Sequence, residues 1–323
     1  MVVLRKEIAM NIFAPSYYKK FKCIADKCRH SCCIGWDVYI DDETLEKYSA
    51  MDGALGERLR KSLKEKEDGV CFAMKENGRC PFLNDCGLCD IITERGEASI
   101  SEICREHPRF YNFFSHRAEM GLGISCEEAA RIVLSAEGKW ELVCVGEDEW
   151  EAEESSEEEL DVISKRDELI KILQGEGCLE ARVDRMLLSA GVSLPQIGIE
   201  EWYRILSDME RLDPIWGDYL DLLSDAGEDK YPAELEKNLE NLLIYFVYHH
   251  VSGATDIEDI PCRAAFAYLG YRVLSAMCTA KNKKDGKYDL ADLCEYARAY
   301  SAEIEYSEEN TELLLELMRR LAL

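Results

Sequence analysis

The stretch Cys23-Ile-Ala-Asp-Lys-Cys28-Arg-His-Ser-Cys32-Cys33 places four cysteines within eleven positions. Six of the 15 cysteines of this 323-residue chain follow at Cys71, Cys80, Cys86, Cys89, Cys104 and Cys126. Thiols grouped this densely either pair as disulfides or bind a soft metal. The N-terminal part therefore predicts a cysteine framework, and its chemistry decides how the rest of the chain is interpreted.

The start of the chain favours metal over disulfides. The opening Met-Val-Val-Leu-Arg-Lys-Glu does not lead into the apolar core of a secretory signal. The longest interior apolar run, Leu242 to Tyr248, is far shorter than the ~20 residues that span a bilayer. We therefore expect a cytoplasmic protein without a membrane partner, in which thiols stay reduced. A disulfide-stapled domain is the less favoured alternative, because a chain of this length buries a core without crosslinks.

The charge of the chain restricts its partners. The formal net charge is −26, from 65 acidic and 39 basic residues. No nucleic-acid partner is expected, because phosphate contacts need a basic face. A lysine-bearing protein partner is compatible with this charge through long-range attraction. An acidic surface that only maintains solubility is the simpler interpretation of the charge alone.

The pattern of apolar residues predicts a mainly α protein. We expect a small, irregular cysteine-cluster domain at residues 1–146 with a short β element at Trp36–Ile40, and a capped helix at Asp41–Tyr48. The acidic run at residues 147–160 indicates a linker or exposed loop. Apolar residues then recur at helical spacing, which predicts an α-helical domain at residues 161–323.

The spacing of the thiols leaves two metals open. Cys86-Gly-Leu-Cys89 has the pair spacing of a structural zinc site. Adjacent Cys32 and Cys33 cannot easily reach the same tetrahedral ion, whereas an iron–sulfur cluster accepts irregularly spaced ligands. The surplus of thiols therefore favours a [4Fe–4S] cluster, and zinc remains the alternative.

Several of these motifs resemble a known family. Phe21-Lys-Cys-Ile24 and Ser31-Cys-Cys-Ile-Gly-Trp-Asp-Val-Tyr-Ile-Asp41 resemble the signature of the flagellin lysine-N-methylase family, within a wider group of zinc- or iron-chelating cysteine-cluster proteins. Cys80-Pro-Phe-Leu83 and Cys104-x3-Pro108-Arg109 are similar to further motifs of that family, as is Asn241-Leu-Leu-Ile-Tyr-Phe246 late in the chain.

The resemblance implies an activity and a ligand set. The chain would transfer a methyl group from S-adenosylmethionine to lysine ε-amines of flagellin, as a protein-lysine N-methyltransferase with a [4Fe–4S] cluster. The implied metal ligands are Cys23, Cys28, Cys32, Cys33, Cys80, Cys89, Cys104 and Cys126. Eight thiols exceed the four that one cluster needs, so some are structural or a second metal is bound. The alternative is a non-catalytic iron- or zinc-binding protein with a structural or sensory cysteine cluster.

Catalytic residues are harder to find. Tyr17, Trp36 and Asp37 are candidates because aromatic side chains favour the neutral lysine and a carboxylate could orient an amine, although packing is the commoner role. Gly121-Leu-Gly123 lacks the context of a dinucleotide-type loop, so no Rossmann cofactor site is expected. The adjacent histidines His249 and His250 should point to different faces of a helix, one in the core and one exposed, with a metal role less favoured.

Overall fold

The computed structural model describes residues 9–151, 153–193, 197–224, 231–286 and 289–321. The chain forms two compact units. The first, here called the helical unit, contains Met1–Phe21, Tyr111–Ser125 and Ala129–Leu323. The second, here called the cysteine unit, contains Lys22–Phe110 and Cys126–Glu128. The fold is mainly α with a minor β component, as the sequence predicts.

A four-stranded sheet belongs to the helical unit, except for the first residues of one strand. Its order is β4-β5-β1-β6, formed by Arg109–Phe114, Arg117–Leu122, Ala9–Pro15 and Leu142–Glu151. Strand β1 pairs in parallel with β5 and antiparallel with β6, for example through Ile12 opposite Gly146. This pairing attaches the N-terminal strand to the helical unit, so the two units differ from the predicted domains 1–146 and 161–323.

The acidic run after residue 146 is not a free linker. Glu147 and Asp148 belong to β6 and pair with Asn11 and Met10 of β1. Helix α6 then begins at Glu157, where the side chain of Ser156 accepts the backbone N–H of Glu159. Self-repulsion of these carboxylates is tolerated because β6 lies at the edge of the sheet, where one side of the strand stays open to solvent.

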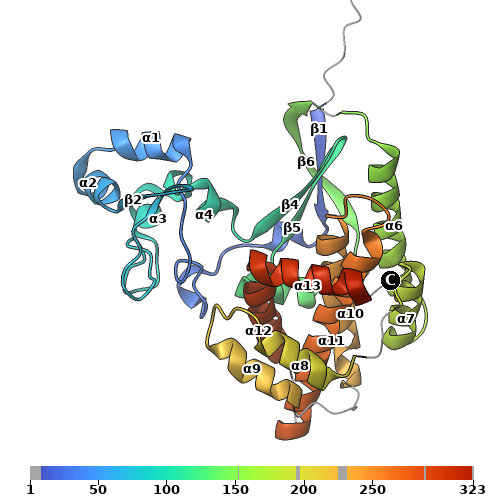
Figure 1. The fold of residues 1–323 in the computed structure, drawn as a ribbon. Coiled ribbons are helices and arrows are strands. Elements are labelled where there is room, and N and C mark those ends of the chain that lie inside the picture. The colour runs from blue at the N-terminus through green and yellow to red at the C-terminus, as the bar shows by residue number, and fades with distance from the viewer. Residues whose placement is uncertain (1–8, 152, 194–196, 225–230, 287–288, 322–323) are drawn as a thin grey trace, which may run out of the picture. The chain divides into compact units, whose positions relative to one another are not determined.

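Helices make up the rest of the helical unit (Figure 1). They are α5 (Glu127–Leu134, which starts in the cysteine unit), α6 (Glu157–Leu173), α7 (Leu179–Ser189), α8 (Ile199–Ser207), α9 (Ile215–Ser224), α10 (Glu236–Phe246), α11 (Ile260–Asp285), α12 (Leu290–Tyr300) and α13 (Glu308–Leu321). Helix α11 contacts α7, α8, α9, α10, α12 and α13, which makes it the centre of the bundle. Both of its ends follow from sequence, with Pro261 in its first turn and Gly286 in the left-handed conformation just beyond its last residue.

Two π-helical turns interrupt this bundle. The turn η5 (Val247–Val251) continues α10, and η6 (Ser301–Glu305) continues α12. Such wider turns are rare, and in many proteins they occur at functional sites. No helix among the described residues has the length and apolar character needed to cross a membrane.

The cysteine unit contains short elements around a small core. These are α1 (Asp42–Ala50), α2 (Gly53–Lys61), β2 (Leu63–Lys66), β3 (Gly69–Phe72), α3 (Asp90–Arg95) and α4 (Glu102–Glu106). The predicted helix at Asp41–Tyr48 is confirmed, because the Asp41 carboxylate accepts the N–H of Thr44 at 2.9 Å. The strand predicted at Trp36–Ile40 is wrong: in this segment only Tyr39 forms a β-bridge, to Cys71.

Candidate metal centre

All ten cysteines of the N-terminal part lie in the cysteine unit, although Cys126 is distant from the others in sequence. Each of them is a free thiol in the structure. Besides burial, the charge of Cys33 raises the pKa of Cys80, Cys89 and Cys104, whereas the charge of Cys23 raises the pKa of Cys28 and Cys32, and the charge of Cys126 also raises that of Cys32. On this basis we group the eight predicted ligands into two sets. The core set comprises Cys33, Cys80, Cys89 and Cys104, and the surface set comprises Cys23, Cys28, Cys32 and Cys126.

The core set is positioned by loops that pack against the small core of the unit. The backbone N–H of Cys80 donates to the carbonyl of Cys33 at 2.8 Å, which ties two loops together. Cys89 stands directly before α3, and Cys104 lies on α4. Cys80 is itself buried, and the other three are half-buried against the same apolar cluster. Four loops that are distant in sequence therefore present sulfur to the same region.

The surface set is linked by a carboxylate. Glu127 accepts the backbone N–H of Arg29 and its Nε–H, both at 2.9 Å. This contact holds the loop of Cys28 beside the segment that carries Cys126, the direct neighbour of Glu127 in sequence. Cys23 and Cys32 are exposed, whereas Cys28 and Cys126 are half-buried. Sequence spacing alone could not place Cys126 here.

Cys32 and Cys33 join the two sets. The Cys32 thiol donates a hydrogen bond to the Cys33 sulfur, which lowers the pKa of Cys33 to about 7 and raises that of Cys32. The positive charge of Arg79 also lowers the pKa of Cys33. The hydrogen bond thus brings together one thiol of each set, and the expectation that Cys32 and Cys33 do not bind the same tetrahedral ion stays a prediction.

When no cation is bound, burial favours the neutral thiol form of Cys80, Cys89 and Cys104. It raises the pKa of Cys80 to about 12 and that of Cys104 to about 11, and the charge of Cys33 adds to both shifts. A bound metal would reverse this preference, because thiolates are its ligands and its charge compensates theirs. The donor set thus fits a metal centre chemically.

The distance between ligand sulfurs differs between a single zinc ion and an iron–sulfur cluster. Four thiolates on one zinc ion, at bond lengths of about 2.3 Å, stand about 3.8 Å apart. Among the described residues, the only group of three or more potential ligand atoms within 4.8 Å of one another is His249, His250 and Glu305. No three of the described thiols therefore lie as close together as the ligands of a single ion, and the choice between zinc and an iron–sulfur cluster stays a prediction.

The three candidate catalytic residues belong to two different units. Tyr17 lies in the helical unit, where its burial raises the pKa of its hydroxyl. Trp36 lies in the cysteine unit and donates its Nε1–H to the carbonyl of Cys32, so it supports the surface set. Asp37 pairs with Lys66. A catalytic role of these residues stays a prediction.

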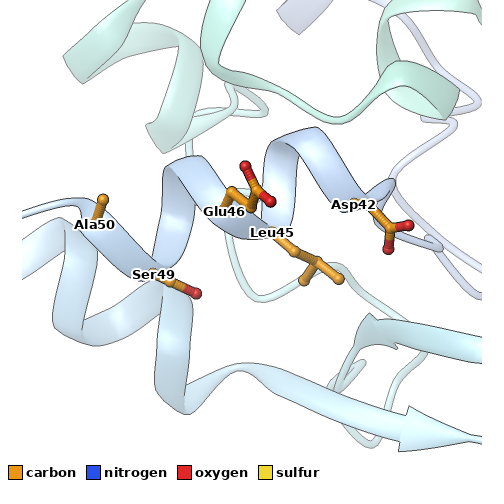
Figure 2. A pocket seen from close by; sticks show the side chains of 5 residues that line it. All are labelled: Asp42, Leu45, Glu46, Ser49 and Ala50. Atoms are coloured by element: carbon orange, nitrogen blue, oxygen red, sulfur yellow. The ribbon is translucent and has the colours of Figure 1, made fainter.

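A hollow of about 660 Å³ lies on α1 in the cysteine unit (Figure 2). It is lined by Asp42, Leu45, Glu46, Ser49 and Ala50. None of these side chains is a predicted metal ligand, and two of them are carboxylates. The hollow therefore adds no cofactor site to the cysteine centre.

Sequence reasoning missed a second group in the helical unit. His250 is buried and His249 is partly exposed, as expected, yet both imidazoles contact the same oxygen of Glu305, at 2.9 and 3.0 Å. The rule that adjacent helical residues face different sides assumes an α-helix, and here the turn is π-helical. An unusual helical turn is not visible in a hydropathy pattern.

Fold and site together define a class of protein, in which a cysteine-rich unit with metal-ligand chemistry is joined to a helical unit. Residues 153–322 match the family model of the FliB lysine N-methylase C-terminal domain. This match spans more than half of the chain, and the chain belongs to the FliB lysine N-methylase family. The matched residues lie in the helical unit, so the cysteine ligand set stays a prediction.

Individual relatives are similar to this chain at low identity and over part of its length. A lysine-N-methylase of Salmonella typhimurium is 25% identical over 142 residues, which are 40% of this chain and 33% of the relative. The flagellar biosynthetic protein FliU of Salmonella muenchen is also 25% identical over 142 residues, covering 40% of this chain and 79% of FliU. The matched part thus spans about a third of the length of the lysine-N-methylase (33%). No solved structure matches the chain.

Proposed function

We propose that this chain methylates lysine ε-amines of flagellin with S-adenosylmethionine as the donor. The observation that carries the proposal is the family match over residues 153–322. The printed names of two relatives, lysine-N-methylase and flagellar biosynthetic protein FliU, support a lysine substrate in a flagellar context.

The chemistry of the transfer sets requirements for the chain. Methyl transfer from a sulfonium is an in-line displacement, so positioning of the two substrates supplies much of the rate. The attacking lysine must be neutral, although its reference pKa is about 10.4. The net charge of −26 would attract lysine-rich surfaces, but carboxylates next to the amine stabilise its charged form. Deprotonation therefore requires an apolar or aromatic position away from the acidic surface.

We further propose that the cysteine unit holds two metal centres, one for each set of thiols, with a [4Fe–4S] cluster favoured over zinc. The surplus of eight thiols over the four ligands that one centre needs supports two centres. Four thiolates complete the coordination of such a centre, which favours a structural role and leaves the methyl donor to be bound elsewhere.

The activity is tested with labelled S-adenosylmethionine and purified flagellin, using metal-replete protein purified without oxygen. We expect labelled methyl-lysine in acid hydrolysates of the flagellin, and none when its lysines have first been blocked by acetylation. Metal-replete protein that transfers no methyl group to flagellin would instead support the non-catalytic metal-binding alternative.

The metal proposal is tested with two variants of one loop. Cys89→Ser removes a ligand of the core set, and Cys86→Ser removes an exposed thiol three positions away that belongs to neither set. We expect the first variant to lose one of the two centres, measured as iron and acid-labile sulfide per chain, and the second to match the wild type. Equal metal content in both variants, or zinc without sulfide in the wild type, would contradict this assignment.

A further inference from the structure

Two histidines and a glutamate converge inside the helical unit. His249 and His250 lie on the π-helical turn η5, and Glu305 is the last residue of the π-helical turn η6. His249 Nδ1 and His250 Nε2 are 2.9 and 3.0 Å from the same atom, Glu305 Oε1. In an α-helix, adjacent side chains are rotated by about 100°, which would separate the two imidazoles. Here their rings lie nearly parallel, with centroids 4.8 Å apart.

The surroundings hold each group in place. Tyr245 donates its hydroxyl to the second oxygen of Glu305 at 3.1 Å. The ring of His250 lies between Phe246 and Phe266, with centroid distances of 5.7 and 4.6 Å. Metal-binding side chains are commonly oriented by such outer contacts, which fix the carboxylate and the ring plane.

One buried atom of this group has no hydrogen-bond partner. The Nε2 of His250 is buried, and its contact with Glu305 does not have the geometry of a hydrogen bond. An orphaned polar atom of this kind is costly unless another group uses it. The Nε2 of His250, the Nδ1 of His249 and an oxygen of Glu305 all lie within 4.8 Å of one another.

We infer that His249 Nδ1, His250 Nε2 and Glu305 Oε1 bind a divalent first-row transition-metal ion. Two imidazoles and one carboxylate are a common ligand set for such ions. At bond lengths of about 2.0–2.2 Å, neighbouring ligand atoms around an ion stand about 3.0–3.4 Å apart, so the observed contacts need only a small expansion. The partly exposed side chain of His249 leaves this group within reach of solvent.

The three residues of this site lie outside the cysteine unit. It lies within residues 153–322, the part of the chain that matches the family model. Its ligands are nitrogen and oxygen, whereas those of the cysteine centre are sulfur. A manganese ion can therefore probe it separately, because Mn²⁺ prefers oxygen and nitrogen ligands to thiolates.

The test is Mn²⁺ binding to the full chain, followed by electron paramagnetic resonance. We expect one tight site per chain with pulsed-resonance couplings from two imidazole nitrogens. His249→Gln should remove one coupling, and both His249→Gln and Glu305→Gln should weaken binding at least tenfold. The matched control is His116→Gln in the same unit, whose imidazole is 3.9 Å from Glu159; it should bind as the wild type does.

Three results would overturn the inference. Bound Mn²⁺ without nitrogen coupling would show adsorption to the acidic surface. Unchanged affinity in two variants with native circular dichroism would show that the ion binds elsewhere, and absence of a tight site in the folded wild type would show that the three groups form only a buried ion pair.

Discussion

The two units differ in the contacts that stabilise them. The helical unit buries long apolar faces, and its central helix α11 has 26 residues with buried side chains along most of its length. The cysteine unit has α-helices of nine residues or fewer in its described part, and its core is one small apolar cluster into which cysteines are mixed. A small core of this kind rarely supplies enough stability alone, and such domains are usually stabilised further by disulfides or a bound metal.

This difference suggests why ten of the 15 thiols lie in one unit. In the helical unit the buried cysteines Cys262, Cys278 and Cys294 replace ordinary small apolar residues within helices. In the cysteine unit most thiols lie on loops and short helices, where packing is least able to fix the chain. Sulfur ligation would compensate there for the apolar area that the short elements cannot bury.

Removing metal should therefore affect the units very differently, and this is the largest effect we expect. Structural metal sites contribute about 10–16 kcal/mol of binding free energy in small domains, most of which is folding free energy. After chelation under reducing conditions, we expect amide hydrogens of the cysteine unit to exchange rapidly with deuterium, while those of α10 and α11 remain protected.

Mass spectrometry of proteolytic fragments would follow both units in one sample. The Cys86→Ser variant serves as the control, because Cys86 is exposed and lies outside both thiol sets. Equal protection of the cysteine unit before and after chelation would show that it does not depend on metal, and the contrast between the units would then be one of size only.

A buried ion pair should make the helical unit vulnerable in its own way. Arg166 and Glu119 are fully buried and form two contacts of 2.6 and 3.1 Å, and Arg166 also donates to Ser252. Arg166→Met leaves Glu119 with Arg117 as its remaining partner. We expect a loss of about 3–5 kcal/mol in the free energy of unfolding, measured by urea titration with far-ultraviolet circular dichroism.

The double variant Arg166→Met, Glu119→Leu sharpens that prediction. Replacing both charges by apolar side chains removes the orphaned carboxylate, so much of the stability should return. Hydrogen exchange of the cysteine unit should stay as in the wild type. If Arg166→Met alone were as stable as the wild type, the ion pair with Arg117 would be sufficient to stabilise the buried carboxylate of Glu119.

Individual elements show which parts of the structure could be predicted from the sequence. The helix after Asp41 and the mainly α class were predictable because caps and helical periodicity are local signals. The pairing of β1 with β6 was not, because it joins strands more than 120 residues apart and the acidic residues of β6 resemble a linker. The eight candidate ligands lie in one unit, but their role stays a prediction, and their two sets depend on loop contacts such as Glu127 with Arg29. The group of His249, His250 and Glu305 lies on two π-helical turns, and no pattern in the sequence indicated those turns.

Packing around the central helix provides a smaller test. Gly270 on α11 lies against Phe246, and a Cβ at this position would stand 2.7 Å from a ring carbon. Phe246 is fully buried, so it cannot easily move away. We expect Gly270→Ala to cost about 1–3 kcal/mol of unfolding free energy despite the better helix propensity of alanine. Gly175→Ala, where the nearest atom stands at 3.0 Å beside a helix end, is the milder comparison.

The smallest effect concerns one carboxylate that caps two helices of the cysteine unit. Asp41 accepts the N–H of Thr44 in α1 and, with its other oxygen, the N–H of Glu102 in α4 at 2.8 Å. Burial alone would raise the pKa of Asp41, but these hydrogen bonds outweigh it and lower the pKa. Asp41→Ala should cost about 0.5–2 kcal/mol at neutral pH, and Asp41→Asn less, because the amide keeps one acceptor.

The pH dependence of this loss has a definite sign. A carboxyl group whose pKa is lower in the folded state stabilises the protein above its unfolded pKa of about 3.9, and the contribution disappears as the pH falls through the folded pKa. The stability difference between wild type and Asp41→Ala should therefore be constant from neutral pH to about pH 5 and shrink in more acidic solution. A difference that grew on acidification would show that Asp41 does not act as the cap, and α1 and α4 would then have to be held in place by the apolar cluster or the thiols alone.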